Sequence, residues 1–100
     1  SSRVNLGIIK AIKKALSFKI REANKALQEL VKVQPKHSIL HYNLALTYAQ
    51  MGNMVKANEH FIRSYHLDAK NYLSGVYAVM TSQLINKKYR KLKAILQDSI

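Results

Sequence analysis

The sequence predicts an all-α fold made of helical hairpins, and three observations lead to that prediction. Its 100 residues include only one proline and three glycines, a low density of helix-breaking residues. Apolar residues recur at three- and four-residue steps, the spacing of one helix face. No segment alternates polar and apolar residues for long enough to form a strand. An apolar content of 48% is typical of a chain that folds.

Turn-forming residues divide the chain into expected helices of about 12 to 15 residues each. Pro35 should stop the helix before it, and Ser38 is placed to cap the helix after it. Gly52-Asn53 interrupts the next apolar stretch, Lys70-Asn71 is a weaker joint, and Asn86-Lys87 separates the stretch 72–85 from a short last helix. The expected helices span residues 20–33, 38–51, 54–67 and 72–85, preceded by a first helix and followed by a short last helix that ends near residue 97.

The stretch 38–71 carries an ordered spacing of large and small residues. In sequence order, these residues are Leu44, Ala45, Tyr48, Gly52, Ala57, Phe61 and Ser64. Leu44, Ala45 and Tyr48 share one helix face, and the small Ala57 allows the second helix to cross close to the first. The pattern resembles the tetratricopeptide repeat, although His41 and Ala69 stand where that family usually has tryptophan and proline.

The resemblance implies one domain of about three antiparallel hairpins, stacked in a right-handed α-solenoid over approximately 4–35, 38–69 and 70–98. The residue pattern of the repeat is clear only over about 20–71. Toward both ends the resemblance covers the hairpin architecture but not the residue pattern. Because one repeat cannot bury its own apolar face, the flanking hairpins should stack on the central hairpin. The chain opens with Ser1 rather than Met, so we expect a segment of a longer protein.

In arrays of this family the first helix of each hairpin lines a concave groove that holds a partner. The expected helix over 38–51 is apolar almost all round, and such a helix is either buried on every side or binds something. We expect a groove for an apolar protein segment; the alternative is that neighbouring repeats or a second copy cover this face. The groove residues implied by the family's helix phase are Ile39, Tyr42, Asn43, Leu46, Leu73, Val76, Tyr77 and Met80.

Positive charge is the second distinctive feature, because 17 Lys and Arg stand against 5 Asp and Glu, a net charge of +12. The cations concentrate toward the two ends of the chain, where they should form a basic outer surface suited to acidic protein surfaces. Contact with nucleic-acid phosphates is the alternative, but only Tyr89 lies among the lysines as a stacking residue. The expected basic surface comprises Lys10, Lys13, Lys14, Lys25, Lys87, Lys88, Arg90 and Lys91.

Residue types that carry chemistry are few and scattered. The absence of cysteine excludes disulfides, thiolate metal sites and thiol catalysis. His37 and His41 are four residues apart, but no carboxylate accompanies them as in the zinc-binding H-E-x-x-H helix. The serines lie outside any G-x-S-x-G motif, and no glycine-rich phosphate loop is present. We therefore expect no enzymatic activity, no metal and no cofactor.

The function predicted from the sequence is that of a protein-binding scaffold or adaptor. Two alternatives stay open: a helical repeat that binds nucleic acid through Lys and Arg, and a structural spacer that associates with itself. No apolar run reaches the roughly 18 to 20 residues that cross a bilayer. The cytoplasm and, after removal of a signal peptide, the periplasm or an exported location are all compatible with the sequence.

Overall fold

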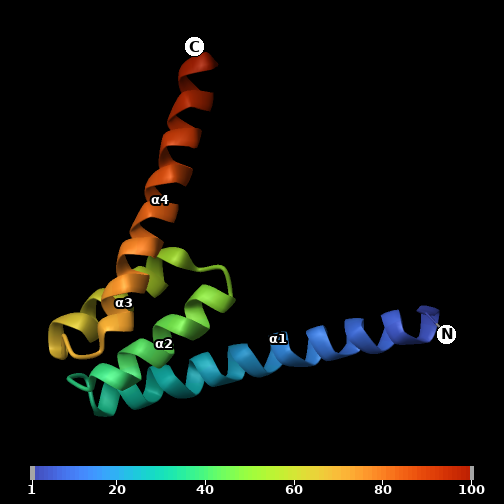
Figure 1. The fold of residues 1–100 in the computed structure, drawn as a ribbon, viewed down its shortest axis with the longest axis horizontal. Coiled ribbons are helices and arrows are strands. Elements are labelled where there is room, and N and C mark those ends of the chain that lie inside the picture. Colours follow the sequence, from blue (N-terminus) through green and yellow to red (C-terminus); the bar gives the residue numbers. More distant parts are fainter. Residues whose placement is uncertain (1, 100) are drawn as a thin grey trace.

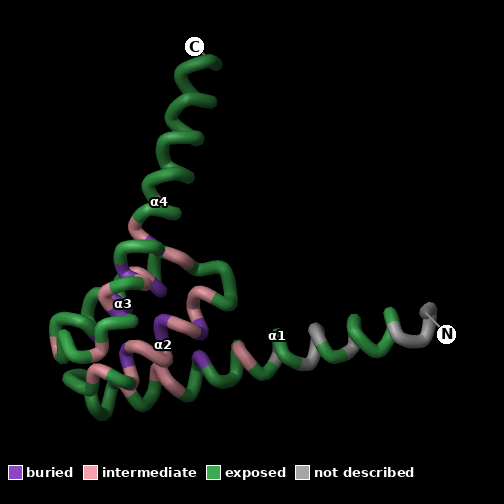
Figure 2. Tube along the Cα trace, viewed as in Figure 1, coloured by how far each residue is buried: buried purple, intermediate pink, exposed green. Residues whose placement is uncertain are grey.

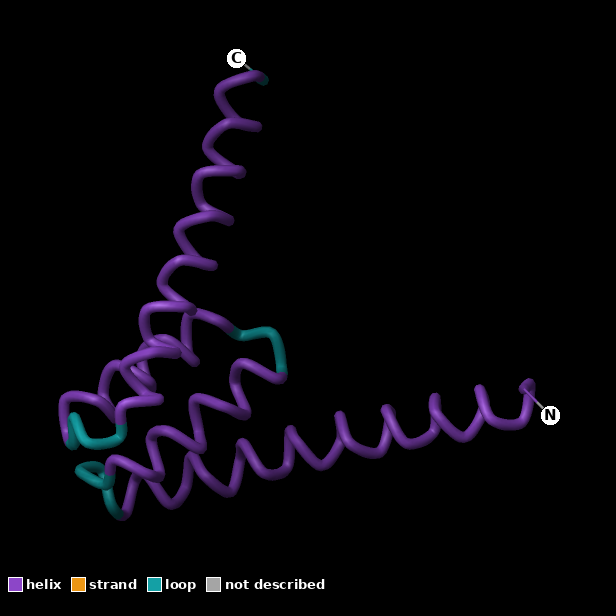
Figure 3. Tube along the Cα trace, viewed as in Figure 1, coloured by secondary structure: helices purple, strands orange, loops and turns teal. Residues whose placement is uncertain are grey.

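The structure is a computed structural model that describes residues 2–99, and all of their side chains except those of residues 2–5, 11, 13–15 and 18. The described residues form an all-α fold of four helices and contain no strand. The helices are α1 (Ser2–Val33), α2 (Ser38–Gln50), α3 (Met54–Leu67) and α4 (Tyr72–Asp98), joined by three short loops (Figures 1 and 3).

Helices α2 and α3 form an antiparallel hairpin at the centre of the molecule. The second half of α1 packs against α2, and the first half of α4 packs against α3 (Figure 1). The remaining halves of α1 and α4 extend past the α2–α3 turn in different directions, which gives extents of 50 × 47 × 22 Å. We call residues 2–19 the N-terminal arm, residues 86–98 the C-terminal arm, and residues 20–85 the body.

Burial is confined to the body (Figure 2). Every described side chain of the two arms is exposed. The apolar core consists of Leu44, Ala45, Ala57, Phe61 and Ala78, contributed by α2, α3 and α4. The alanines let the three helices approach closely, and Phe61 fills the space between them. These core positions of α2 and α3 are the ones that the sequence spacing predicted to face each other.

The turn between α2 and α3 confirms the break predicted at Gly52. This residue has a φ of 83°, in the left-handed region that glycine enters without steric cost. Asn53 then caps α3, because its side-chain oxygen accepts a hydrogen bond from the backbone N–H of Lys56 at 3.1 Å. The predicted cap at Ser38 is wrong: His37 caps α2 instead, and Ser38 is its first helical residue.

The hairpins expected over 4–35 and 70–98 do not form. Helix α1 continues through Phe18, which stands where the repeat pattern has its turn glycine, and α4 continues through Asn86-Lys87, so each expected hairpin is one continuous helix. Neither break contains a glycine or proline, and the flanking residues are mainly Lys, Arg, Leu and Ala, which favour helix. Each further helical residue adds a backbone hydrogen bond, so a helix without a terminating residue continues.

A buried hydroxyl cluster joins three helices at the other end of the hairpin. The Ser64 hydroxyl of α3 donates to the carbonyl oxygen of Ser38 at 2.8 Å. It therefore accepts hydrogen bonds from the Ser74 hydroxyl at 2.7 Å and from the Asn71 side-chain amide at 3.2 Å. Ser64 is fully buried, so its partners have no water to replace it.

The Ser64→Ala substitution is expected to lower the free energy of unfolding by about 1–3 kcal/mol, because it leaves buried polar partners unsatisfied. Urea unfolding followed by circular dichroism measures the change. The control, Ser17→Ala, alters an exposed position of α1 and should change stability by no more than about 0.5 kcal/mol. Equal effects of the two substitutions would contradict a structural role for the hydroxyl cluster.

Candidate functional site

The eight predicted groove residues lie on α2 and on the first half of α4, and the structure separates them into two sets. We call the first set the exposed groove residues, and these are Ile39, Leu73, Val76 and Met80. The half-buried set is Tyr42, Asn43, Leu46 and Tyr77. The exposed fraction is 59% for Ile39, 47% for Val76 and 49% for Met80, so these residues lie on an open surface.

The half-buried tyrosines belong to an aromatic cluster that joins α2, α3 and α4. The rings of Tyr42 and Tyr77 stack with centroids 6.3 Å apart, and Phe61 lies 5.4 Å from Tyr77 and 5.9 Å from Tyr42. Burial, with smaller contributions from Tyr77 and Tyr72, raises the pKa of Tyr42 above its ordinary value. These tyrosines thus help to hold α2 beside α4, a role that helical spacing alone did not reveal.

The described residues of the predicted basic surface are all exposed. The side chains of Lys13 and Lys14 lie outside the described residues, and the others are Lys10, Lys25, Lys87, Lys88, Arg90 and Lys91. Lys25 lies in the body, whereas the rest lie on the arms. Among the described residues, the ion pairs are Lys32–Glu29 and Lys56–Glu59, both within the body.

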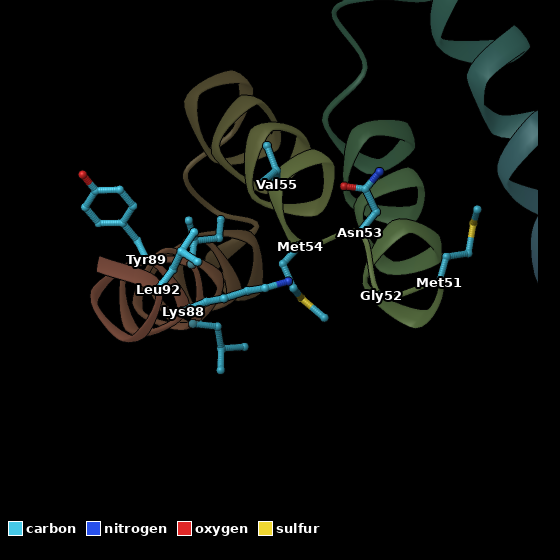
Figure 4. Close-up of a pocket in the computed structure, with 10 residues that line it drawn as sticks. Met51, Gly52, Asn53, Met54, Val55, Lys88, Tyr89 and Leu92 are labelled. Atoms are coloured by element: carbon cyan, nitrogen blue, oxygen red, sulfur yellow. The ribbon is translucent and has the colours of Figure 1, made fainter. Parts of the chain in front are cut away.

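A cavity of about 640 Å³ lies between the α2–α3 turn and α4 (Figure 4). Its lining is mainly apolar, and the residues are Met51, Gly52, Asn53, Met54, Val55, Leu84, Ile85, Lys88, Tyr89 and Leu92. Lys88 is the one cation among them, and it extends from α4 toward Met54 (Figure 4). The volume falls within the range of sites that bind small molecules or side chains of a partner.

This cavity was not predicted from the sequence, because a turn was expected at Asn86-Lys87. A turn there would have removed Tyr89 and Leu92 from the end of α4. The signal that could have revealed the cavity is the spacing of Ile85, Leu92 and the residues between them, which continues the helical period of α4 without interruption.

A second hollow of about 400 Å³ lies along the first half of α4. Its lining residues are Tyr65, Tyr72, Gly75, Val76 and Val79. A Cβ atom on Gly75 would lie 3.1 Å from the ring of Tyr65, so the glycine is what allows this tyrosine to pack against α4. In the expected hairpin over 70–98, the returning helix would have covered this face of α4.

Two histidines meet in the interface of α2 and α3, away from both hollows. His41 Nε2 donates to the carbonyl oxygen of Pro35 at 2.7 Å, which leaves its Nδ1 to accept from His60 Nδ1 at 3.0 Å. The ring of Tyr48 stacks on His60 with centroids 5.6 Å apart. His37 instead accepts from the backbone N–H of Leu40, so it does not join this pair. No cluster of three metal-binding side chains occurs among the described residues.

The lining residues of the two hollows include no histidine and no carboxylate. They offer mainly apolar surface, together with one ammonium group, one amide and three tyrosine hydroxyls, and this suits binding of apolar groups. None of the helices, over the residues described, is both long enough and apolar enough to cross a bilayer. No known protein family and no curated protein sequence matches the chain.

The interface histidines give stability a pH dependence. Burial, followed by the proximity of His41, lowers the pKa of His60 below the unfolded value of 6.5. Between the pKa of His60 in the folded protein and its pKa in the unfolded chain, the unfolded chain binds more protons than the folded protein. The stability contributed by neutral His60 is therefore present above about pH 6.5 and is lost as the pH falls below it. Urea unfolding at a series of pH values should show this loss.

The His60→Gln variant should show a smaller loss of stability on acidification than the unaltered chain. His66→Gln is the matched control, because His66 is an exposed residue of the same helix. An unchanged pH profile in the His60→Gln variant would show that the histidine interface does not cause the dependence.

Proposed function

We propose that this chain is a protein-interaction module similar to tetratricopeptide repeats, and that it binds an apolar segment of another protein. The observation that carries the proposal is the exposure of large apolar side chains on two neighbouring helices. Ile39 of α2 and Val76 and Met80 of α4 lie on the surface without cover from the body. Exposed apolar surface of this kind is typical of sites that bind other proteins.

The central hairpin supports the family resemblance. Leu44, Ala45, Ala57 and Phe61 are buried at the positions that the repeat pattern assigns to the helix interface. Gly52 occupies the turn with a positive φ, as the pattern expects. The continuous helices α1 and α4 depart from the pattern, so the resemblance is supported over α2 and α3 and carries less weight at the ends.

Nucleic-acid binding is the second candidate, and one observation favours it. The described cations of the arms are exposed and have no ion-pair partner among the described residues. Phosphate contacts by such cations would give affinity that falls steeply with salt. Protein binding is preferred because the apolar groove residues would remain exposed to water in a complex held by phosphates alone.

Selection from a library of displayed random peptides tests the proposal. Peptides rich in apolar residues should be enriched, and the double substitution Ile39→Asp with Met80→Glu should weaken their binding by about tenfold or more. Both side chains are exposed, so circular dichroism should show unchanged helix content. The aspartate introduced in place of Ile39 lies near the start of α2, where the helix dipole favours a negative charge.

Val33→Glu is the matched control, since Val33 is an exposed apolar residue of α1 outside the groove set. It should leave peptide affinity unchanged. Enrichment of peptides without apolar bias, or equal weakening by the control, would contradict the proposal. Selective retention of duplex DNA in place of any peptide would favour the second candidate.

A further inference from the structure

The face of α4 that packs against α3 continues along the C-terminal arm. Within the body this face includes the buried residues Ala78 and Thr81. Steps of four, four, three and four residues then lead from Thr81 through Ile85, Tyr89 and Leu92 to Leu96, and these residues share the same side of the helix. The contact with α3 stops where α3 begins, at Met54, and α4 continues beyond it. Leu92 is therefore 54% exposed. The C-terminal arm therefore carries an apolar stripe that the body leaves uncovered.

The cavity lies where this stripe leaves the body. Met51, Met54 and Val55 of the turn and the first residues of α3 form one wall, while Ile85 and Leu92 form the other. A partner that lies along the stripe can thus insert an apolar side chain into the cavity. This combination of a helix face and a side-chain pocket is the geometry by which proteins bind amphipathic helices.

The N-terminal arm also leaves large apolar side chains exposed. Within the body, α1 packs on α2, where Asn24 donates to the Thr47 hydroxyl at 2.9 Å. Toward the N-terminus, α1 carries the exposed apolar residues Leu6, Ile9, Ile12 and Leu16. By helical position Ile12 lies about 120° round the helix from Asn24, so these residues do not form one continuation of the side that packs on α2. The α2–α3 hairpin lies between the body halves of α1 and α4, and the two arms leave the body in different directions (Figure 1).

Charge determines which partner fits the stripe of the C-terminal arm. The two arms hold ten of the seventeen cations of the chain and one of its five acidic residues, Asp98. By helical position, Lys88 and Lys93 flank the stripe of the C-terminal arm on opposite sides. A second copy would bring cations against cations with almost no carboxylate to neutralise them. A partner with an apolar face and acidic edges matches both the stripe and its flanks.

We infer that the C-terminal arm and the α2–α3 turn form a docking site for an acidic amphipathic helix of another protein. The apolar face of that helix lies on Ile85, Leu92 and Leu96, and its carboxylates approach Lys88 and Lys93. The inference rests on the proposed function in that the partner is a protein. It uses a different surface from the exposed groove residues, so the two sites can be tested separately.

Other charged partners fit the geometry less well. A nucleic acid would satisfy the lysines but would leave the apolar stripe in water. A flat bilayer surface presents no side chain that would enter the cavity between the α2–α3 turn and α4. An acidic helix covers the stripe and pairs with its flanks at once.

The test uses a fluorescently labelled synthetic peptide of about 16 residues, roughly the length of the arm with its last body turn. Its leucines share one helix face and its other positions are mainly glutamate and alanine. Titration with the full chain at low salt, followed by fluorescence anisotropy, should show saturable binding that weakens as salt increases. A peptide of the same composition, with its leucines scattered round the helix, should bind about tenfold more weakly or worse.

Variants of the chain locate the site. Lys88→Glu and Leu92→Ser should each weaken binding of the leucine–glutamate peptide by about tenfold, because one reverses a flanking charge and the other removes a pocket contact. Both residues are exposed, so the fold should be retained. Lys25→Glu, which reverses an exposed charge of the body, and the Ile39→Asp/Met80→Glu double variant should keep the original affinity.

Four results would overturn the inference. The first is equal binding of the scattered peptide, and the second is undiminished binding by the Lys88→Glu and Leu92→Ser variants. The third is tighter binding of duplex DNA or anionic vesicles than of the peptide. The fourth is a dimer in sedimentation that Leu92→Ser abolishes. Undiminished binding by these two variants would remove this site and leave the proposed function in place. Loss of binding in the groove double variant alone would assign the acidic helix to the groove residues.

Discussion

Residues 8–34 and 76–100 contain no glycine, and the one proline of the chain lies at position 35. This lack of helix-breaking residues determines the shape of the molecule, because α1 and α4 have nothing to end them where the α2–α3 hairpin ends. Both helices therefore project beyond the body, and their apolar faces project with them. The uncovered stripe of the C-terminal arm, the cavity beside the turn and the second hollow along α4 all follow from this continuity.

The body and the arms combine two different kinds of surface. The body holds together through small residues, the Tyr42–Phe61–Tyr77 cluster and the buried hydroxyl of Ser64, and it carries only a small excess of cations. The arms contribute little to the core and hold most of the positive charge. A division of this kind lets the arms meet a charged partner while the body keeps its packing, since the charges lie far from the core.

The central hairpin could be predicted from the sequence because its packing depends on local spacing. The positions of Leu44, Ala45, Ala57 and Phe61 follow from helical period and residue size, and the turn follows from Gly52. Continuity past Phe18 and Asn86-Lys87 was not predicted, because the repeat pattern places a turn near each position, although the helix preference of the flanking residues favours a continuous helix. The burial of Tyr42 and Tyr77 and the cavity beside Lys88 depend on contacts between helices, which spacing within one helix does not specify.

The continuity of α4 is tested most directly by NMR spectroscopy of the isotopically labelled chain. A continuous α4 predicts helical Cα chemical shifts without interruption from Leu84 to Lys91 and no nuclear Overhauser contact between the methyl groups of Leu92 and Val79. Coil-like shifts at Asn86 and Lys87, together with a Leu92–Val79 contact, would show that the arm folds back on the first half of α4. That result would remove both the exposed stripe and the cavity from which the docking site is inferred.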